Sequence, residues 1–436
     1  MSARRVVITG LGVICPLGNS AESLWDALVN GRSGVGPWDT PMTEALPARY
    51  AALAREFTGD IDDFGPLEKE QKKSIRKGLK LMCRESQMAV AAAQRAIGDA
   101  GLTAGRFDPD RAGCVFGTDY MLTLPEDFSE AIVACRDANG VFDYSRWGSE
   151  GIGKVMPLWL LKYLPNMPAS HVAIYNDLRG PSNSITLREA AANLAVGEAF
   201  HTIARGSADI MVVGATGTRV HPMKCVHAMQ SEELADNNIE ATRASRPFDR
   251  NRTGMVLGEG AGVVILEELA TAQARGSRIY AEVIGAGSAQ VAHSNDVAQR
   301  DKALGHVIRK SLAQARLSPG DVGHIHAHGL GTHSCDADEA RAIRGTFGEA
   351  ASRVPVTAAK SYFGNLGAGS GVVELIASVL ALTNRRLPPV LNFETPDPDC
   401  PITPATAEHP DPGSSFVNLS VTPQGQASAV VVRQLA

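Results

Sequence analysis

The stretch SRPFDRNRTGMVLGEGAGVVILEELATAQARGSRIYAEVIG, residues 245–285, decides the fold of this 436-residue chain. It holds a short apolar run at Gly262–Leu266, a polar segment with a helical pattern at Glu267–Ser277, and a second apolar run at Ile279–Ile284. Short apolar runs bounded by glycine are typical of buried strands. Strands that alternate with helical segments predict an α/β layered fold, in which Glu267–Ser277 connects two halves.

The same alternation continues outward in both directions and predicts halves at residues 1–266 and 267–436. A strand followed by glycines occurs in each half, as MVVGATG (211–217) and IHAHGLG (325–331), but this repeat is too weak to establish a duplication. The other predicted strands are Arg5–Thr9, Ala112–Gly117, Asp209–Gly214, Val322–Ala327 and Ala429–Arg433; the predicted helices are Met82–Ile97, Ala190–Arg205, Ala303–Ala315 and Gly371–Leu382.

Composition excludes several classes of protein. A net charge of −5 argues against nucleic acid as the main partner, because phosphate binding needs a basic excess. The 7 cysteines are scattered without a CxxC pair, which predicts reduced thiols in a cytoplasmic chain and neither a disulfide framework nor a metal site. No cofactor is expected.

The N-terminus lacks the apolar core of a signal peptide. Apolar stretches such as Met156–Leu161 are too short to span a bilayer, so we expect no membrane insertion.

Two stretches stand apart from the layered pattern. Lys69–Lys80 carries six basic residues, and it is either a solvated helix face or a docking patch for an acidic partner. Tyr120–Arg179 is long, irregular and aromatic, which is typical of a segment that covers a core or builds a subunit contact.

From Val6 onward the chain resembles the β-ketoacyl-acyl-carrier-protein synthase II family. The resemblance rests on the opening segment VVITGLGVICPLGNSAESLWDALVNGRSGV, on residues 245–285, and on three shorter blocks: GPSNSI (180–185), AHGLGTHSCDADE (327–339) and AAKSYFGNLGAGSG (358–371). It implies a duplicated thiolase-like fold of five α-β-α-β-α layers, and a dimer. It also implies a site that joins an acyl chain held on a cysteine to malonyl carried by acyl carrier protein.

The family's functional residues can be carried over by position. The nucleophilic cysteine falls on Glu189, the first histidine on His328, the supporting lysine on Lys360, and the second histidine on Asn365. The acidic neighbours of the lysine fall on Asp336 and Glu339, and the gating loop falls on Asn418–Gln424.

A carboxylate is a poor substitute for the thiolate, since it would form a mixed anhydride that water destroys. Cys225 and Cys335 are interpreted as structural thiols. Glu189 has two interpretations of equal weight: a capping box with Thr186 at a helix start, or a general base at the thiolate position. His328 and Asn365 could together bind a thioester carbonyl.

A second interpretation is that His328, Lys360, Asp336 and Glu339 persist only as a buried polar network.

Three functions follow in order of preference. The first is a non-condensing partner subunit, similar to a chain length factor, that pairs with an intact ketosynthase. The second is an enzyme that acts on acyl or malonyl thioesters without a covalent intermediate, by decarboxylation or by base catalysis from Glu189. Ordinary condensation is last. The expected partners are acyl carrier protein or an acyl thioester, and a second subunit in a homodimer or heterodimer.

Overall fold

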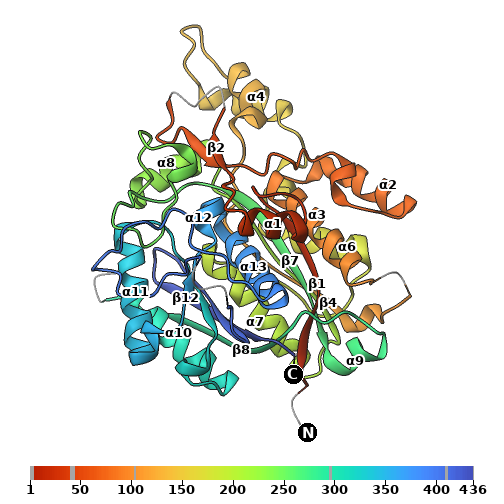
Figure 1. Cartoon of the computed structure of the whole chain (residues 1–436). Helices are drawn as coiled ribbons and strands as arrows, with labels where there is room; N and C mark the ends of the chain where they lie inside the picture. The colour runs from red at the N-terminus through yellow and green to blue at the C-terminus, as the bar shows by residue number, and fades with distance from the viewer. Residues whose placement is uncertain (1–3, 40–44, 103–104, 294–296, 408–410, 436) are drawn as a thin grey trace.

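The computed structural model describes residues 4–39, 45–102, 105–293, 297–407 and 411–435 (Figure 1). Its strands are β1 (Val6–Ile14), β2 (Val35–Pro37), β3 (Tyr50–Ala52), β4 (Ala112–Thr118), β5 (Ser182–Thr186), β6 (Ile210–Thr218), β7 (Glu259–Glu268), β8 (Ala281–Gln290), β9 (His324–His326), β10 (Val356–Thr357), β11 (Ser415–Val421) and β12 (Gln426–Arg433). Its α-helices are α1 (Ala21–Val29), α2 (Lys69–Gly78), α3 (Arg84–Asp99), α4 (Ser129–Ala134), α5 (Trp159–Lys162), α6 (Met167–Asn176), α7 (Ala191–Ala204), α8 (Pro222–Ser231), α9 (Leu269–Ala274), α10 (Arg300–Ala315), α11 (His333–Phe347), α12 (Lys360–Phe363) and α13 (Ser370–Asn384).

The order of the strands shows the duplication that the sequence could not establish. Within the described residues, the strands of the main sheet run β10-β9-β11-β12-β8-β1-β7-β6-β4-β5. We number the five strands of each half in chain order, β1, β4, β5, β6 and β7 in the first half and β8 to β12 in the second. From the outer edge of the sheet inward, both halves then have the same order: third strand, second, fourth, fifth and first. Their pairing also agrees, because the second strand is parallel to the third and the fourth, whereas the fifth is antiparallel to both its neighbours. The halves join where β1 pairs antiparallel with β8.

Helices cover this double sheet in layers (Figure 1). Helix α3 packs on β1, β6 and β7, and α10 packs on β8 and β12. Between the halves lie α7, which contacts β4 and β6 as well as β8 and β12, and α13, which contacts β7 and β11. The arrangement is therefore the five-layered thiolase-like architecture, and the predicted helices 190–205 and 371–382 form its central layer.

The central helix α13 corrects one expectation about apolar stretches. Gly367–Asn384 is 18 residues long and apolar enough to cross a membrane by length and composition, but 89% of it is buried inside the fold. Such burial is typical of the core helix of a two-sided α/β protein, and its apolar residues are accounted for by packing against both halves.

The predicted gating loop is also only partly a loop. Residues 418–421 belong to β11 and pair with β12, and all four of their side chains are buried. Only the turn at Thr422–Gly425 remains of it, closed by a hydrogen bond from Gly425 N to the Thr422 carbonyl (3.0 Å).

Candidate functional site

Glu189 lies where the edge strand β5 passes into the central helix α7, within the short 3-10 helix Arg188–Ala190. Its side chain is 1% exposed. It accepts a hydrogen bond from the guanidinium of Arg219, which follows β6, and a second from Asn365 Nδ2 at 3.1 Å. The structure therefore brings Glu189 and Asn365 into direct contact, although they are far apart in sequence.

The capping-box interpretation of Glu189 is wrong. Leu187 occupies the N-cap position of this 3-10 helix and makes no side-chain capping bond. Thr186 is still part of β5, and its hydroxyl lies 3.1 Å from the hydroxyl of Thr118 on the neighbouring strand. The carboxylate instead turns to Arg219, because a buried charge is stabilised far more by a guanidinium than by one backbone amide.

A group of charged side chains surrounds Glu189. Arg188 Nε lies 3.5 Å from Glu189 Oε2, and its Nη2 donates to Glu232 Oε1 at 2.7 Å. Asp119 lies 4.0 Å from Arg219 Nη1. Burial alone would raise the pKa of Glu189, but the Arg219 and Arg188 guanidiniums outweigh it and lower the pKa well below its ordinary value. Glu189 is consequently ionised, and its ion pairs with the two arginines hold its side chain in place.

His328 lies just after β9, and its backbone N–H donates to Glu339 Oε1 at 2.7 Å. Burial and the neighbouring Lys360 charge lower the pKa of His328 well below its ordinary value, so the imidazole is neutral. Lys360 Nζ lies 3.3 Å from His328 Nδ1, where the lysine is the donor, and this leaves the ring proton on Nε2. His328 can therefore donate one hydrogen bond through Nε2.

The carboxylate that pairs with Lys360 is Glu374 on α13, with its Oε1 at 2.5 Å from Lys360 Nζ. This partner was not predicted from the sequence. Lys360 also donates to the carbonyl of His328 at 2.7 Å. Asp336 and Glu339, the expected neighbours of the lysine, instead accept hydrogen bonds from the backbone N–H groups of residues 328–331, and Asp336 also accepts one from Phe248 N. Burial raises the pKa of Asp336 to about 6 and that of Glu339 to about 7. Their role is to hold the backbone that presents His328.

One of the missed residues left a signal in the sequence. Glu374 is an acidic residue inside the apolar run GVVELIASVLAL, and charged residues are almost never fully buried unless they are paired, so this position predicted a partner. Arg219 left none, because the predicted strand ends at Gly214 and only the structure extends β6 to Thr218. The identity of that partner could not be found from the pattern alone.

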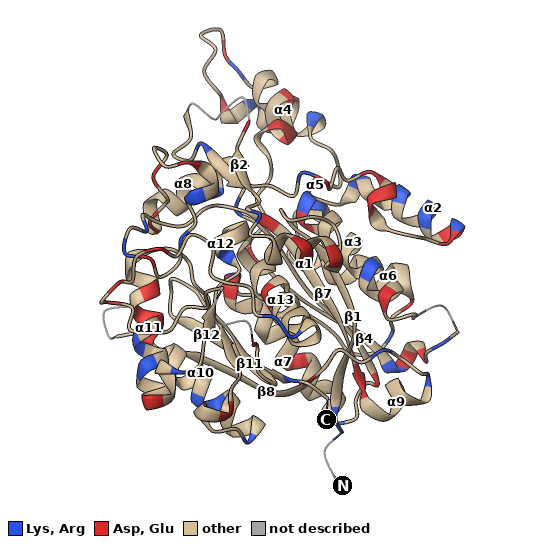
Figure 2. Ribbon diagram, in the orientation of Figure 1, with Lys and Arg blue, Asp and Glu red and all other residues tan. Residues whose placement is uncertain are grey.

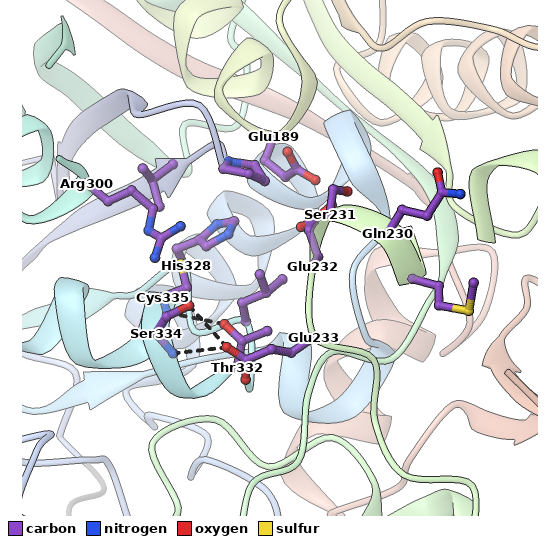
Figure 3. Close-up of a pocket in the computed structure, with 14 residues that line it drawn as sticks. Glu189, Gln230, Ser231, Glu232, Glu233, Arg300, His328, Thr332, Ser334 and Cys335 are labelled. Carbon is purple, nitrogen blue, oxygen red and sulfur yellow. Dashed lines mark hydrogen bonds between the residues drawn. The ribbon is translucent and has the colours of Figure 1, made fainter. Parts of the chain in front are cut away.

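Next to Glu189 and His328 lies a cavity of about 300 Å³. Figure 3 shows Glu189, Arg300 and His328 around one part of it, with Glu232 and Glu233 on the loop that follows α8. Glu233 fixes the opposite rim, because it accepts hydrogen bonds from His333 N (2.8 Å) and Ser334 Oγ (3.1 Å).

Neither candidate thiol is poised for nucleophilic attack. Cys335 lines the cavity, but burial raises its pKa well above the ordinary value. Burial likewise raises the pKa of Cys225 to about 11. All seven cysteines of the chain are buried and free. Among the residues that the structure describes, no group of three or more His, Cys, Asp or Glu side chains is placed to hold a metal ion.

The remaining polar groups have limited chemical freedom. The side-chain amide nitrogen of Asn365 donates to Glu189, and its side-chain oxygen accepts from Gly367 N at 3.0 Å. Both polar atoms of this side chain therefore already have partners. Of the residues carried over from the family, the neutral imidazole of His328 and the ion-paired carboxylate of Glu189 line the cavity.

The duplicated five-layered fold, with a histidine and a lysine beside the start of its central helix, defines the class of thiolase-like proteins. The N-terminal domain of β-ketoacyl synthase matches residues 3–272 and the C-terminal domain matches residues 280–394. The chain belongs to the β-ketoacyl synthase family.

The similarity to known relatives extends over nearly the full length of the chain. A 3-oxoacyl-acyl-carrier-protein synthase 2 of Synechocystis sp. is 33% identical over 404 residues, 92% of this chain and 90% of that protein. Among solved structures, the ishigamide ketosynthase/chain length factor has a TM-score of 0.83 at 27% identity and covers 100% of both chains. A type II polyketide synthase acyl carrier protein in complex with its ketosynthase bound to the hexaketide gives 0.83 at 26% identity, again covering 100% of both.

Proposed function

We propose that this ketosynthase-like chain of fatty acid or polyketide biosynthesis holds no acyl group covalently and acts as a non-condensing partner subunit of an intact ketosynthase. The observation that carries the proposal is the burial of Glu189 and its pairing with Arg219. The family resemblance assigns this residue to the position of the nucleophilic cysteine. A carboxylate in that state is a weak nucleophile toward a thioester, and water would destroy the mixed anhydride that it would form.

The alternative, non-covalent thioester chemistry, is supported less well. A carboxylate whose pKa is lowered by two guanidiniums is a weak base. Its negative charge would also repel a malonyl carboxylate, which disfavours decarboxylation. Asn365 is committed to Glu189 and Gly367, so His328 alone would have to polarise a thioester carbonyl.

The edge of the main sheet supports an assembly through the β5 side of the molecule. Strand β5 pairs with β4 on one side only, and residues 182, 183 and 186 are exposed. An unpaired edge strand is a template for pairing with another chain. The segment Tyr120–Arg179, which carries α4 at its projecting end (Figure 1), adds exposed apolar side chains such as Val141 (62%) and Leu160 (54%). We infer a homodimer or a heterodimer with an intact ketosynthase, in which this surface is covered.

Helix α2 supports recognition of an acyl carrier protein. Lys69, Lys73, Arg76 and Lys77 are exposed on it. Figure 2 shows several basic positions, in blue, along this helix. Two of the basic residues of this helix have acidic partners, since Lys72 pairs with Asp62 and Lys73 Nζ lies 4.0 Å from Glu70 Oε2. A cluster of exposed cations suits a partner with acidic residues. The cytoplasmic location expected from the sequence stays a prediction.

Intact-protein mass spectrometry tests the missing covalent step. The purified chain, incubated with acyl carrier protein thioesters, should gain no acyl mass. Glu189→Cys should gain it, because Arg219 and Arg188 would favour the thiolate at the same position. A stable adduct on the parent chain that disappears in Cys335→Ser or Cys225→Ser would overturn the proposal.

Co-expression with an intact ketosynthase tests the partner role. The two chains should co-purify as a 1:1 complex, and the length of the polyketide product should change when this chain is omitted. A chain that remains monomeric by light scattering, alone and with the ketosynthase at micromolar concentration, would contradict the partner role.

A further inference from the structure

A second and larger cavity, of about 610 Å³, lies on the outer side of the first half. Its floor is formed by Ala112, Ile210 and Val212, at the beginnings of β4 and β6. Its walls come from α2, α3 and α6, which contribute Gln71, Ile97 and Ile174 among others. The volume lies within the range of about 300–1,000 Å³ that small-molecule sites occupy.

This cavity is separate from the site around Glu189. Ile210 begins β6, whereas Arg219 follows the opposite end of the same strand. An extended strand rises about 3.3 Å per residue, so the two cavities lie roughly 30 Å apart along β6. A ligand bound on this outer side would not touch Glu189 or His328.

One buried amide in the wall lacks a hydrogen-bond partner. Gln94 on α3 is 6% exposed, and its Nε2 has no partner within the described residues. Its carbonyl accepts from Gln71 Nε2 at 3.0 Å, and that same nitrogen also reaches Asn176 Oδ1 at 3.0 Å. An unpaired buried amide donor is costly, so a ligand oxygen that reached Gln94 after a small side-chain rotation would be favoured.

The charges around the cavity restrict the ligand further. Its acidic lining residues are Glu68, which is exposed, and Asp177, which is already paired with Arg179 at 2.8 Å. No lysine or arginine is among the described residues that line it. An anionic head group would therefore find no cation, whereas a hydroxyl or carboxamide oxygen would find the Gln94 amide.

We propose that this cavity binds an uncharged amphiphile, an aliphatic chain ending in a hydroxyl or carboxamide group, with the chain on the floor of β4 and β6 and the polar end at Gln94. This site is independent of the role proposed for Glu189, and its test measures binding and not activity.

Calorimetric titration with 1-hexanol, 1-octanol and 1-decanol is the first measurement. Each added methylene should strengthen binding about fourfold if the chain is buried. Decanamide should bind as decanol does, and decanoate should bind at least tenfold more weakly. Absence of any binding by decanol, or equal binding by decanoate, would overturn the proposal.

Three variants locate the site. Gln94→Met keeps the volume but removes the donor, so decanol affinity should fall about fivefold. Gly98 lines the cavity on α3, and a Cβ there would meet nothing within 4 Å, so Gly98→Leu should fold normally and obstruct binding by at least tenfold. Gly345 is the matched control, because it lies at the same place near the end of α11 and its Cβ would also meet nothing within 4 Å. Unchanged binding in Gly98→Leu, or an equal loss in Gly345→Leu, would refute the assignment.

Discussion

Replacing Glu189 by Gln should destabilise the protein far more than the loss of a surface charge would. The carboxylate and its partner Arg219 are each 1% exposed. Removing one member of a buried pair leaves the other charge uncompensated, which typically costs ~3–5 kcal/mol. Asp119 lies 4.0 Å from Arg219 and retains part of the compensation, so a value near the lower bound, ~3 kcal/mol, is expected.

The measurement is urea unfolding at pH 7 and fixed protein concentration. Because the pKa of Glu189 is lowered in the folded state, its stabilisation is complete above the ordinary carboxyl value of about 4.3 and is lost only as the pH falls below it. At pH 7 the full effect is therefore present. Glu189→Leu combined with Arg219→Met should recover only part of the loss, since it removes both members of the pair but takes the nearby cation away from the buried Asp119.

Glu198 supplies the matched control on the same helix. It pairs with Arg205 at 3.7 Å, and its side chain is 39% exposed. Glu198→Gln should change the free energy of unfolding by less than ~1 kcal/mol, as exposed pairs do. If Glu189→Gln changed stability no more than Glu198→Gln, the buried pair would not hold the start of α7, and the reasoning about a locked carboxylate would fail.

Three further predictions concern other parts of the chain. Lys360→Met should lower the free energy of unfolding by ~3–5 kcal/mol, because it leaves the buried Glu374 carboxylate without its cation. Adding Glu374→Gln should recover part of that loss in the same urea assay. Burial lowers the pKa of His324 to about 4 in the folded protein. Below about pH 6.5 only the unfolded chain takes up this proton, so the free energy of unfolding should fall by roughly 3 kcal/mol between pH 6.5 and pH 4. His324→Asn should remove that part of the pH slope, and an identical slope in both proteins would contradict it. On α2, Lys73→Glu should weaken binding of an acyl carrier protein about fivefold at low salt and much less at high salt, whereas Lys302→Glu on α10 should not; equal effects would exclude α2 as the docking surface.

Sequence patterns alone predicted the α/β layering, because buried strands and helices need apolar residues at their own spacing. The predicted helices 190–205 and 371–382 were confirmed as α7 and α13, and the predicted connection at 267–277 contains α9. The division into residues 1–266 and 267–436 stays a prediction. The family resemblance also placed Glu189 and Asn365 in one site, and their hydrogen bond confirms that proximity.

Only the tertiary structure decided the charge pairing and the duplication. Arg219 is the partner of Glu189, and Glu374 is the partner of Lys360, because the fold brings the end of β6 and the first half of α13 to the start of α7. A sequence shows that a buried charge needs a partner, but the partner is set by packing between segments that are distant along the chain. For the same reason the repeated strand order became visible only in the sheet, since equal topology does not require equal side chains.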